Sequence, residues 1–158
     1  MPEKRSILFV CMGNICRSPA AEIIFRKLAH DAGLSDQLYI DSAGTINYHT
    51  GNPPDPRMSE SLASRGYHIQ GLARQVKTDD LDRFDLILAM DEDNLADVRA
   101  LDTKHEHSDK IRAFVEYLEN HDAPHIPDPY YGGQKGFDRV IELLEDGCGG
   151  LLGQLQEP

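Results

Sequence analysis

The stretch LFVCMGNICRSPAAE at residues 8–22 contains a strand signal, a polar loop and a helix signal in direct succession. The apolar run at residues 6–10 is typical of a short buried strand. Ser18 and Pro19 are a natural N-cap and first residue of a helix, and apolar residues then recur at helical spacing. We therefore expect a strand, a loop over residues 11–17 and a helix.

Strand and helix signals alternate through the rest of the chain. This alternation predicts a single α/β domain over residues 1–158, with a four-stranded parallel sheet and helices on both faces. The loop between the first strand and the first helix would lie at the carboxyl edge of the sheet, where such folds bind ligands. The other expected elements are strands at residues 38–42, 84–89 and 110–114, helices opening at Asp55-Pro56 and at residues 91–93, an irregular loop at residues 126–133 and a last helix at residues 137–155.

The loop at residues 11–17 has the chemistry of an anion site. Backbone N–H groups before a helix N-terminus can converge on an anion, and the helix dipole adds positive potential. Gly13 is expected to permit the tight turn, and Asn14 tolerates positive φ. Arg17 can present a planar fork to phosphate oxygens, an environment that favours the thiolate form of Cys11. A lone cysteine at a strand end is usually a buried apolar residue, but this spacing of Cys, Gly, Asn, Arg and Ser-Pro is a specific signal for phosphate chemistry.

Net charge, apolar runs and cysteine content exclude several classes of function and partner. The net charge is −11 over 158 residues, yet residues 1–30 sum to +3. An acidic bulk disfavours nucleic acid and anionic membranes as partners and leaves the N-terminal segment for an anion. No apolar run approaches the roughly 18 residues of a membrane span, and the first is too short for a signal peptide, so we expect a cytoplasmic protein. The three cysteines, Cys11, Cys16 and Cys148, form no disulfide framework and have no zinc spacing, so we expect no metal or cofactor.

The segment at residues 8–22 resembles the signature of the low-molecular-weight protein tyrosine phosphatase family, with Cys and Arg in a C-x5-R arrangement followed by Ser. The resemblance extends over nearly the full chain. Other segments occur in the family's order and approximate spacing: Asp41-Ser-Ala43, Gly51-Asn-Pro-Pro-Asp55, Ala73-Arg-Gln75, Met90-Asp-Glu-Asp-Asn-Leu95 and Asp128-Pro-Tyr-Tyr131.

The resemblance implies roles for three catalytic residues. Cys11 would form a phosphocysteine intermediate, Arg17 would hold the phosphoryl oxygens, and Asp128 would act as general acid and then as general base. On its own an Asp-Pro pair in a loop is nearly always a turn, so the role of Asp128 rests on the resemblance. The substrates would be phosphotyrosine-containing proteins, with a tyrosine kinase as a candidate partner.

Other residues would organise the site around these three. Ser18 would hydrogen-bond the thiolate, and Asn14 would fix the loop through a network that reaches Ser42. The phosphate-binding loop would comprise Met12, Gly13, Asn14, Ile15, Cys16 and Ser18, and the substrate pocket would be walled by Ile15, Tyr48, Tyr130 and Tyr131. The curl of the loop should also bring Cys16 close to Cys11, where it could capture an oxidised nucleophile as a disulfide; the alternative is that Cys16 only packs under the loop.

The chain departs from the family pattern at Gly71, where some members carry a histidine joined to the network; this bears on the rigidity of the loop. Arg74 and Asp91 are interpreted as structural, as a clamp on the loop.

The sequence argues against three alternative functions. Arsenate reduction, known in enzymes with this fold and loop, needs two further cysteines around the third strand, and residues 76–95 contain none. An idle phosphotyrosine-binding module is disfavoured because Cys11 and Asp128 are both present. Relatives that act on phosphoarginine carry a threonine where Ile15 stands, and this apolar side chain favours a phenyl ring.

Overall fold

The computed structural model describes residues 4–130 and 132–157. Its centre is a parallel sheet of four strands in the order β2-β1-β3-β4. The strands are β1 (Arg5–Cys11), β2 (Leu38–Gly44), β3 (Leu86–Ala89) and β4 (Ile111–Ala113). The strand order reverses between β1 and β3, so the loops that follow these two strands meet at the carboxyl edge of the sheet. The predicted fold class is confirmed.

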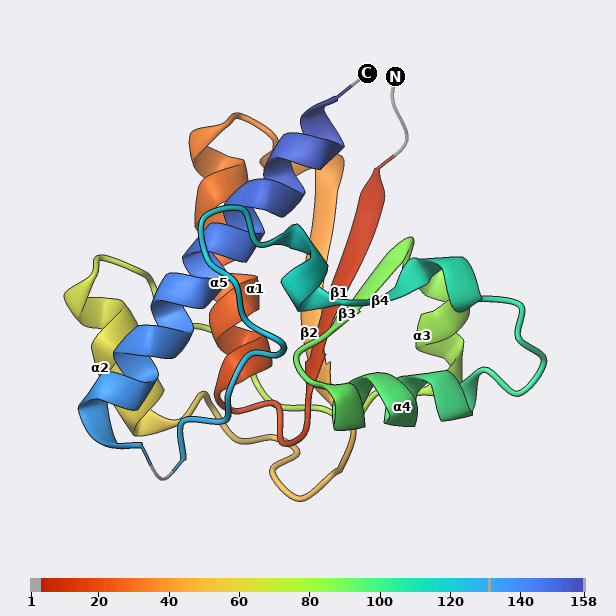
Figure 1. Cartoon of the computed structure of the whole chain (residues 1–158), viewed down its shortest axis with the longest axis horizontal. Coiled ribbons are helices and arrows are strands. Elements are labelled where there is room, and N and C mark those ends of the chain that lie inside the picture. Colours follow the sequence, from red (N-terminus) through yellow and green to blue (C-terminus); the bar gives the residue numbers. More distant parts are fainter. Residues whose placement is uncertain (1–3, 131, 158) are drawn as a thin grey trace.

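Helices cover both faces of the sheet (Figure 1). The helices α1 (Arg17–Asp31), α2 (Pro56–Ser64) and α5 (Gly133–Gln156) lie on one face, and α3 (Thr78–Arg83) and α4 (Glu92–Leu101) lie on the other. Short 3-10 helices occur at Ser35–Gln37, Ser108–Lys110 and Phe114–Tyr117.

The alternation of side chains along β1 builds two cores. Ile7 and Phe9 point into the core under α1 and α5, and Leu8 and Val10 point into the core under α3 and α4. All four side chains are almost completely buried. Consecutive apolar residues in β1 therefore reflect its central place in the sheet. The end of the strand at Cys11 is packed between the two cores.

Helix starts differ from the sequence expectation in three places. Helix α1 begins at Arg17 with Cys16 in the N-cap position, so Ser18 is not the cap; its hydroxyl is used by the site instead. Helix α5 begins at Gly133, within the segment expected to be irregular, where Gln134 binds Ser61 and Asp138. Helix α3 was not predicted, because its six residues are too few to show a helical period.

Two glycines let α5 lie close to the 3-10 helix at Phe114–Tyr117. A β-carbon at Gly147 would overlap the ring of Phe114, and one at Gly150 would overlap the carbonyl oxygen of Tyr117. By contrast, a β-carbon at Gly149 would meet nothing within 4 Å. Packing therefore requires a glycine at positions 147 and 150 of α5, but not at position 149.

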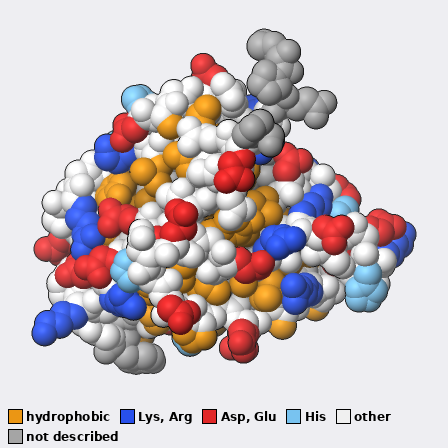
Figure 2. Space-filling model, turned by 45° about the horizontal axis from the view of Figure 1, so that its top comes forward, with side chains coloured by type: hydrophobic (Ala, Val, Ile, Leu, Met, Phe, Trp, Pro, Cys, Tyr) orange, Lys and Arg blue, Asp and Glu red, His pale blue; other side chains and the backbone are white. Residues whose placement is uncertain are grey.

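The surface carries interspersed charges. On the face shown in Figure 2, acidic and basic side chains alternate, with apolar side chains visible between them. Within residues 4–130 and 132–157, no helix is long and apolar enough to cross a membrane.

Candidate active site

The loop after β1 has backbone N–H groups that find no partner among the described residues. Within the described residues, no hydrogen bond uses the N–H groups of residues 12–16. The carbonyl groups of the same loop are engaged: Cys11 O accepts from Thr45, Met12 O from Ile46 and Ile15 O from Asp55, at 2.7–3.1 Å. Because the carbonyl groups point outward, the N–H groups can converge on the inner side of the loop. This is the arrangement of a backbone nest for an anion.

Backbone geometry agrees with the sequence expectation at Asn14 and gives a different reason for Gly13. Asn14 has a φ of 56°, as its residue type allowed. Gly13 does not have a positive φ; instead a β-carbon there would lie 3.0 Å from the His49 ring. Gly44, which the sequence did not single out, lies so close to the loop that a β-carbon would be 2.7 Å from Met12 O. A β-carbon at Gly44 would therefore require the backbone to shift, whereas one at Gly13 would press only on the His49 side chain.

A buried chain of hydrogen bonds runs from the thiol of Cys11 into α1. The sulfur lies 3.0 Å from Ser18 Oγ. Asn14 Nδ2 donates to Ser18 Oγ at 2.8 Å and to Ser42 Oγ at 3.0 Å. Ser42 Oγ in turn donates to Glu22 Oε1 at 2.7 Å. The structure therefore brings together three residues that the sequence placed in one network, Asn14, Ser18 and Ser42.

Glu22 is a member of this network that sequence reasoning missed. Burial raises the pKa of its carboxyl, opposed by hydrogen bonds from Ser42 and Arg26. A cavity of about 10 Å³ lies beside it, lined in part by Asn14, Ser42 and Gly71. In this chain the network therefore ends on a carboxyl group next to Gly71. The sequence did contain a signal for Glu22: an acidic residue one helical turn after Ser18, on the apolar face of α1 that carries Ala21 and Phe25.

A further set of contacts fixes the loop from its outer side. The backbone N–H of Arg74 donates to Asn14 Oδ1 at 3.0 Å. The Arg74 guanidinium pairs with Asp41 at 3.0 Å and with the buried Asp80 at 2.9 Å. The expected clamp at Arg74 is thus present in the geometry.

Arg17 is buried and oriented by two acceptors. Its Nη1 donates to Asp91 Oδ2 at 2.6 Å and to Ile126 O at 3.0 Å. Within the described residues, no hydrogen bond uses its Nε or Nη2. Asp91 follows β3 and caps α4, so the two loops at the switch point meet at this ion pair. Asp91 therefore caps α4 and also orients the Arg17 guanidinium, whose Nε and Nη2 groups remain available to bind a ligand.

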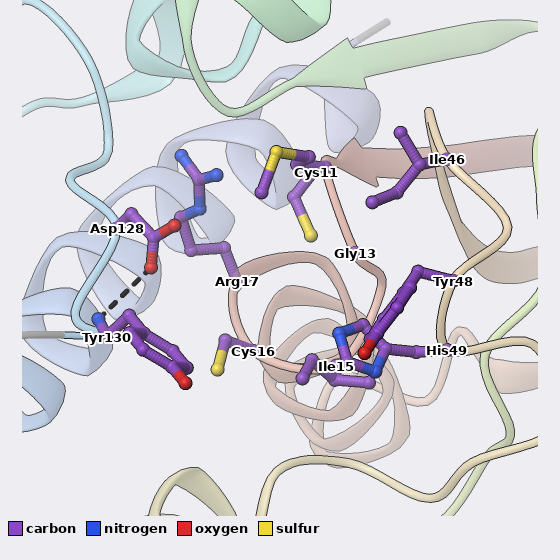
Figure 3. Close-up of a pocket in the computed structure, with 11 residues that line it drawn as sticks. Cys11, Gly13, Ile15, Cys16, Arg17, Ile46, Tyr48, His49, Asp128 and Tyr130 are labelled. Atoms are coloured by element: carbon purple, nitrogen blue, oxygen red, sulfur yellow. Dashed lines mark hydrogen bonds between the residues drawn. The ribbon is translucent and has the colours of Figure 1, made fainter.

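The loop borders a pocket of about 380 Å³ (Figure 3). Asp128 and Tyr130 lie on one side, and Ile46, Tyr48 and His49 lie on the other. The base and remaining wall are formed by Cys11, Met12, Gly13, Ile15, Cys16 and Arg17.

The aromatic walls agree with expectation in part. Tyr48 and Tyr130 both line the pocket, and both are exposed, at 81% and 52%. Tyr131 lies outside the described residues. His49 also lines the pocket, which the sequence did not predict, and its ring packs edge-on against Tyr48. The only sequence signal for His49 was its position in the loop after β2.

Asp128 is placed by its own loop. Its Oδ1 accepts the backbone N–H of Tyr130 at 3.1 Å, shown dashed in Figure 3. This turn leaves the carboxyl group in the lining of the pocket, on the same side as the Arg17 guanidinium. A proton donor at this position can reach a leaving group that points out of the pocket.

Cys16 also lies in the pocket, but as a neutral thiol. Burial raises its pKa to about 12, with further contributions from Asp55, Cys11 and Asp128. All three cysteines are free, and Cys148 is fully buried in α5.

Comparison with known proteins gives one consistent result. The sequence model for the family "Low molecular weight phosphotyrosine protein phosphatase" matches residues 6–158. The low molecular weight protein-tyrosine-phosphatase YfkJ of Bacillus subtilis is 44% identical over 153 residues, covering 96% of each protein. A crystal structure of a protein tyrosine phosphatase from Entamoeba histolytica has a TM-score of 0.94 at 42% identity and covers 97% of each chain. The crystal structure of drosophila arginine phosphatase has a TM-score of 0.88 at 31% identity, covering 96% of this chain and 98% of that one.

The chain therefore belongs to the low molecular weight phosphotyrosine protein phosphatase family. Within that family it is a protein-tyrosine phosphatase, an enzyme of the hydrolase class.

Proposed function

We propose that the enzyme hydrolyses phosphotyrosine through a phosphocysteine intermediate on Cys11, with Arg17 binding the phosphoryl group and Asp128 as general acid and base. The observation that carries the proposal is the loop itself: its N–H groups have no partners within the described residues, and the Cys11 sulfur lies in the pocket that they border. Positive potential from the amides and from the guanidinium would take the place of a metal ion.

Two displacements complete the reaction. In the first, the Cys11 thiolate attacks phosphorus, the bond from phosphorus to the phenolic oxygen breaks, and Asp128 gives its proton to that oxygen. In the second, Asp128 takes a proton from water as the water oxygen attacks phosphorus, and the sulfur leaves as a thiolate. Ser18 would stabilise that thiolate in both steps, through the contact of 3.0 Å.

Phosphotyrosine fits the pocket better than the shorter phosphoserine. Phosphorus must approach within about 3–3.5 Å of the sulfur. A phenyl ring between Tyr48 and Tyr130 would gain about 0.5–1.5 kcal/mol per aromatic pair beyond the area that it buries. Phosphoserine would have to bring its backbone into the pocket to reach Cys11.

Phosphoarginine is the competing substrate, because a structural relative named as an arginine phosphatase shares the fold. The wall of this pocket contains Ile15, whose apolar side chain favours a ring over a polar guanidinium. Matched peptides that carry phosphotyrosine, phosphoarginine or phosphoserine test the assignment through kcat/KM. We expect phosphotyrosine to be preferred and phosphoserine to be inert. A phosphoarginine peptide that outperformed phosphotyrosine would overturn the assignment, and Ile15→Thr would then be the variant to measure.

Redox sensitivity is part of the proposal. Cys16 and Cys11 line the same pocket, and burial raises the pKa of Cys16, so that it is a neutral thiol beside the reactive Cys11. Oxidation of the Cys11 thiolate by peroxide would give a sulfenic acid. The Cys16 sulfur would then attack the Cys11 sulfur, the sulfur–oxygen bond would break, and the hydroxyl group would leave as water with the thiol proton, which forms a disulfide. Reduction by a dithiol would restore activity.

The physiological substrates would be phosphotyrosine proteins of the cytoplasm, a tyrosine kinase among them. A Cys11→Ser variant retains the amide nest and lacks the nucleophile, so it should capture such proteins from lysates treated to preserve phosphotyrosine. Equal capture by Cys11→Ser with Arg17→Ala added would show that the capture does not use the pocket.

A further inference from the structure

Arg57, which the sequence did not single out, connects the two loops of the active site. It is the second residue of α2, two positions after the N-cap residue Asp55. Its Nε and Nη2 each lie 3.3 Å from an oxygen of Asp55, one on each carboxylate oxygen. Its Nη1 donates to Tyr130 O at 3.1 Å. One planar guanidinium therefore spans two segments that are 73 residues apart in sequence.

The Asp55 side of this connection leads to the phosphate loop. The backbone N–H of Asp55 donates to Ile15 O at 2.7 Å, one of the contacts that turn the loop carbonyls outward. Asp55 itself is 8% exposed. Burial raises the pKa of its carboxyl, but hydrogen bonds from Arg57 and Met58 outweigh burial and lower the pKa overall. The carboxylate is therefore charged at neutral pH and gives the guanidinium a fixed anchor.

The Tyr130 side leads to the proposed general acid. The N–H of Tyr130 donates to Asp128, and the carbonyl oxygen of Tyr130 accepts from Arg57. The backbone of Tyr130 is therefore held at both its N–H and its C=O. The Arg57 guanidinium also lies over the rings of Tyr130 and Phe137, at 5.1 and 4.9 Å from their centroids. On the other side of Asp128, Ile126 O is held by Arg17. The loop that carries Asp128 is thus fixed before and after it, each time by an arginine.

We propose that Arg57 is a positioning residue for the reaction: by joining Asp55 to Tyr130 it sets the place of the Asp128 carboxyl relative to the Cys11 sulfur. The inference rests on the proposed role of Asp128. Arg57 is not among the residues that line the pocket, so it acts through the loop and not on the substrate. Arginine suits this task because a planar fork can satisfy two acceptors in fixed directions, which the point charge of lysine does not reproduce.

The test is a double-mutant cycle with Asp128. Arg57→Ala should lower kcat for a phosphotyrosine peptide by about 10- to 100-fold, the range expected when a reacting group is displaced by about 1 Å. The loss should shrink for aryl phosphates whose leaving groups need no proton. In an Asp128→Ala background, Arg57→Ala should cause no further loss, because the group that it positions is gone. Arg57→Lys should recover part of the activity of Arg57→Ala.

Two further measurements separate positioning from general damage. Competitive inhibition by inorganic phosphate should change less than about threefold in Arg57→Ala, since the amide nest stays in place. Arg65→Ala is the matched control: Arg65 caps the other end of α2 and binds Glu145 at 3.1 Å, and its loss should leave the leaving-group dependence unchanged.

The outcomes are distinct. A normal kcat in Arg57→Ala, or an equal loss with and without Asp128, overturns the role of Arg57. Weakened phosphate inhibition in proportion to the loss of kcat would place its effect on the phosphate loop and also overturn it. If Asp128→Ala itself shows no dependence on the leaving group, the proposed function fails first, whatever Arg57 does.

Discussion

Replacing Ser18 by alanine removes one oxygen atom from the centre of the site. The hydroxyl is fully buried, accepts a hydrogen bond from Asn14 Nδ2 at 2.8 Å, and lies 3.0 Å from the Cys11 sulfur. Its single proton can go to the sulfur or to Ala43 O, which is 3.4 Å away. The shorter contact and the charge of a thiolate both favour donation to the sulfur.

The size of the effect follows from this contact. A hydrogen bond to a charged group contributes about 1.5–3 kcal/mol, and each 1.36 kcal/mol changes a rate tenfold. We therefore expect kcat to fall by about 10- to 150-fold. The larger part should fall on breakdown of the phosphocysteine, because the sulfur must leave as an anion in that step.

Rapid-mixing kinetics with p-nitrophenyl phosphate would measure both steps. Ser18→Ala should retain a burst of nitrophenol followed by a slow steady state. Ser64→Ala, at an exposed position on α2, is the control and should behave as wild type. Wild-type kcat in Ser18→Ala, or a loss confined to the first step, would refute the reasoning.

Three further predictions concern the acid, the second thiol and the last helix. Asp128→Ala should lower kcat for phosphotyrosine by roughly 10²–10⁴, with a smaller loss for aryl phosphates with good leaving groups; equal losses across leaving groups would remove Asp128 from the acid role. Cys16→Ser should recover less activity than wild type when peroxide-treated enzyme is reduced with dithiothreitol, and equal recovery would exclude a protective disulfide with Cys11. Gly149→Ala should raise the free energy of unfolding by about 0.5–1 kcal/mol through helix propensity, whereas Gly150→Ala should lower it by overpacking; urea unfolding compares them, and the same sign for both would contradict the helix packing.

The predictable parts of the fold are those in which local sequence and tertiary packing agree. β1 is apolar at consecutive positions because both of its faces are buried, and Asp55-Pro56 opens a helix in the structure as in the sequence. The start of α5 could not be predicted, because the polar segment from Gly133 to Gly136 has no apolar period. It becomes helical in part through contacts of Gln134 with α2, which are tertiary.

The same distinction holds for the site. Residues contiguous in the loop, from Cys11 to Ser18, could be predicted because their chemistry lies within one short segment. Glu22 and Arg57 could not, because each acts through a partner distant in sequence: Glu22 through Ser42, and Arg57 through Tyr130. A buried glutamate and a surface arginine are ordinary features until the partner's position is known.

The identity of the nucleophile is the central claim, and trapping the intermediate tests it most directly. The enzyme would be mixed rapidly with a ³²P-labelled phosphotyrosine peptide, quenched and digested, and the labelled fragment sequenced. The account predicts label on Cys11 within the burst phase, loss of that label in Cys11→Ser, and its accumulation in Ser18→Ala. Label on another residue, or turnover that persists in Cys11→Ser, would contradict it.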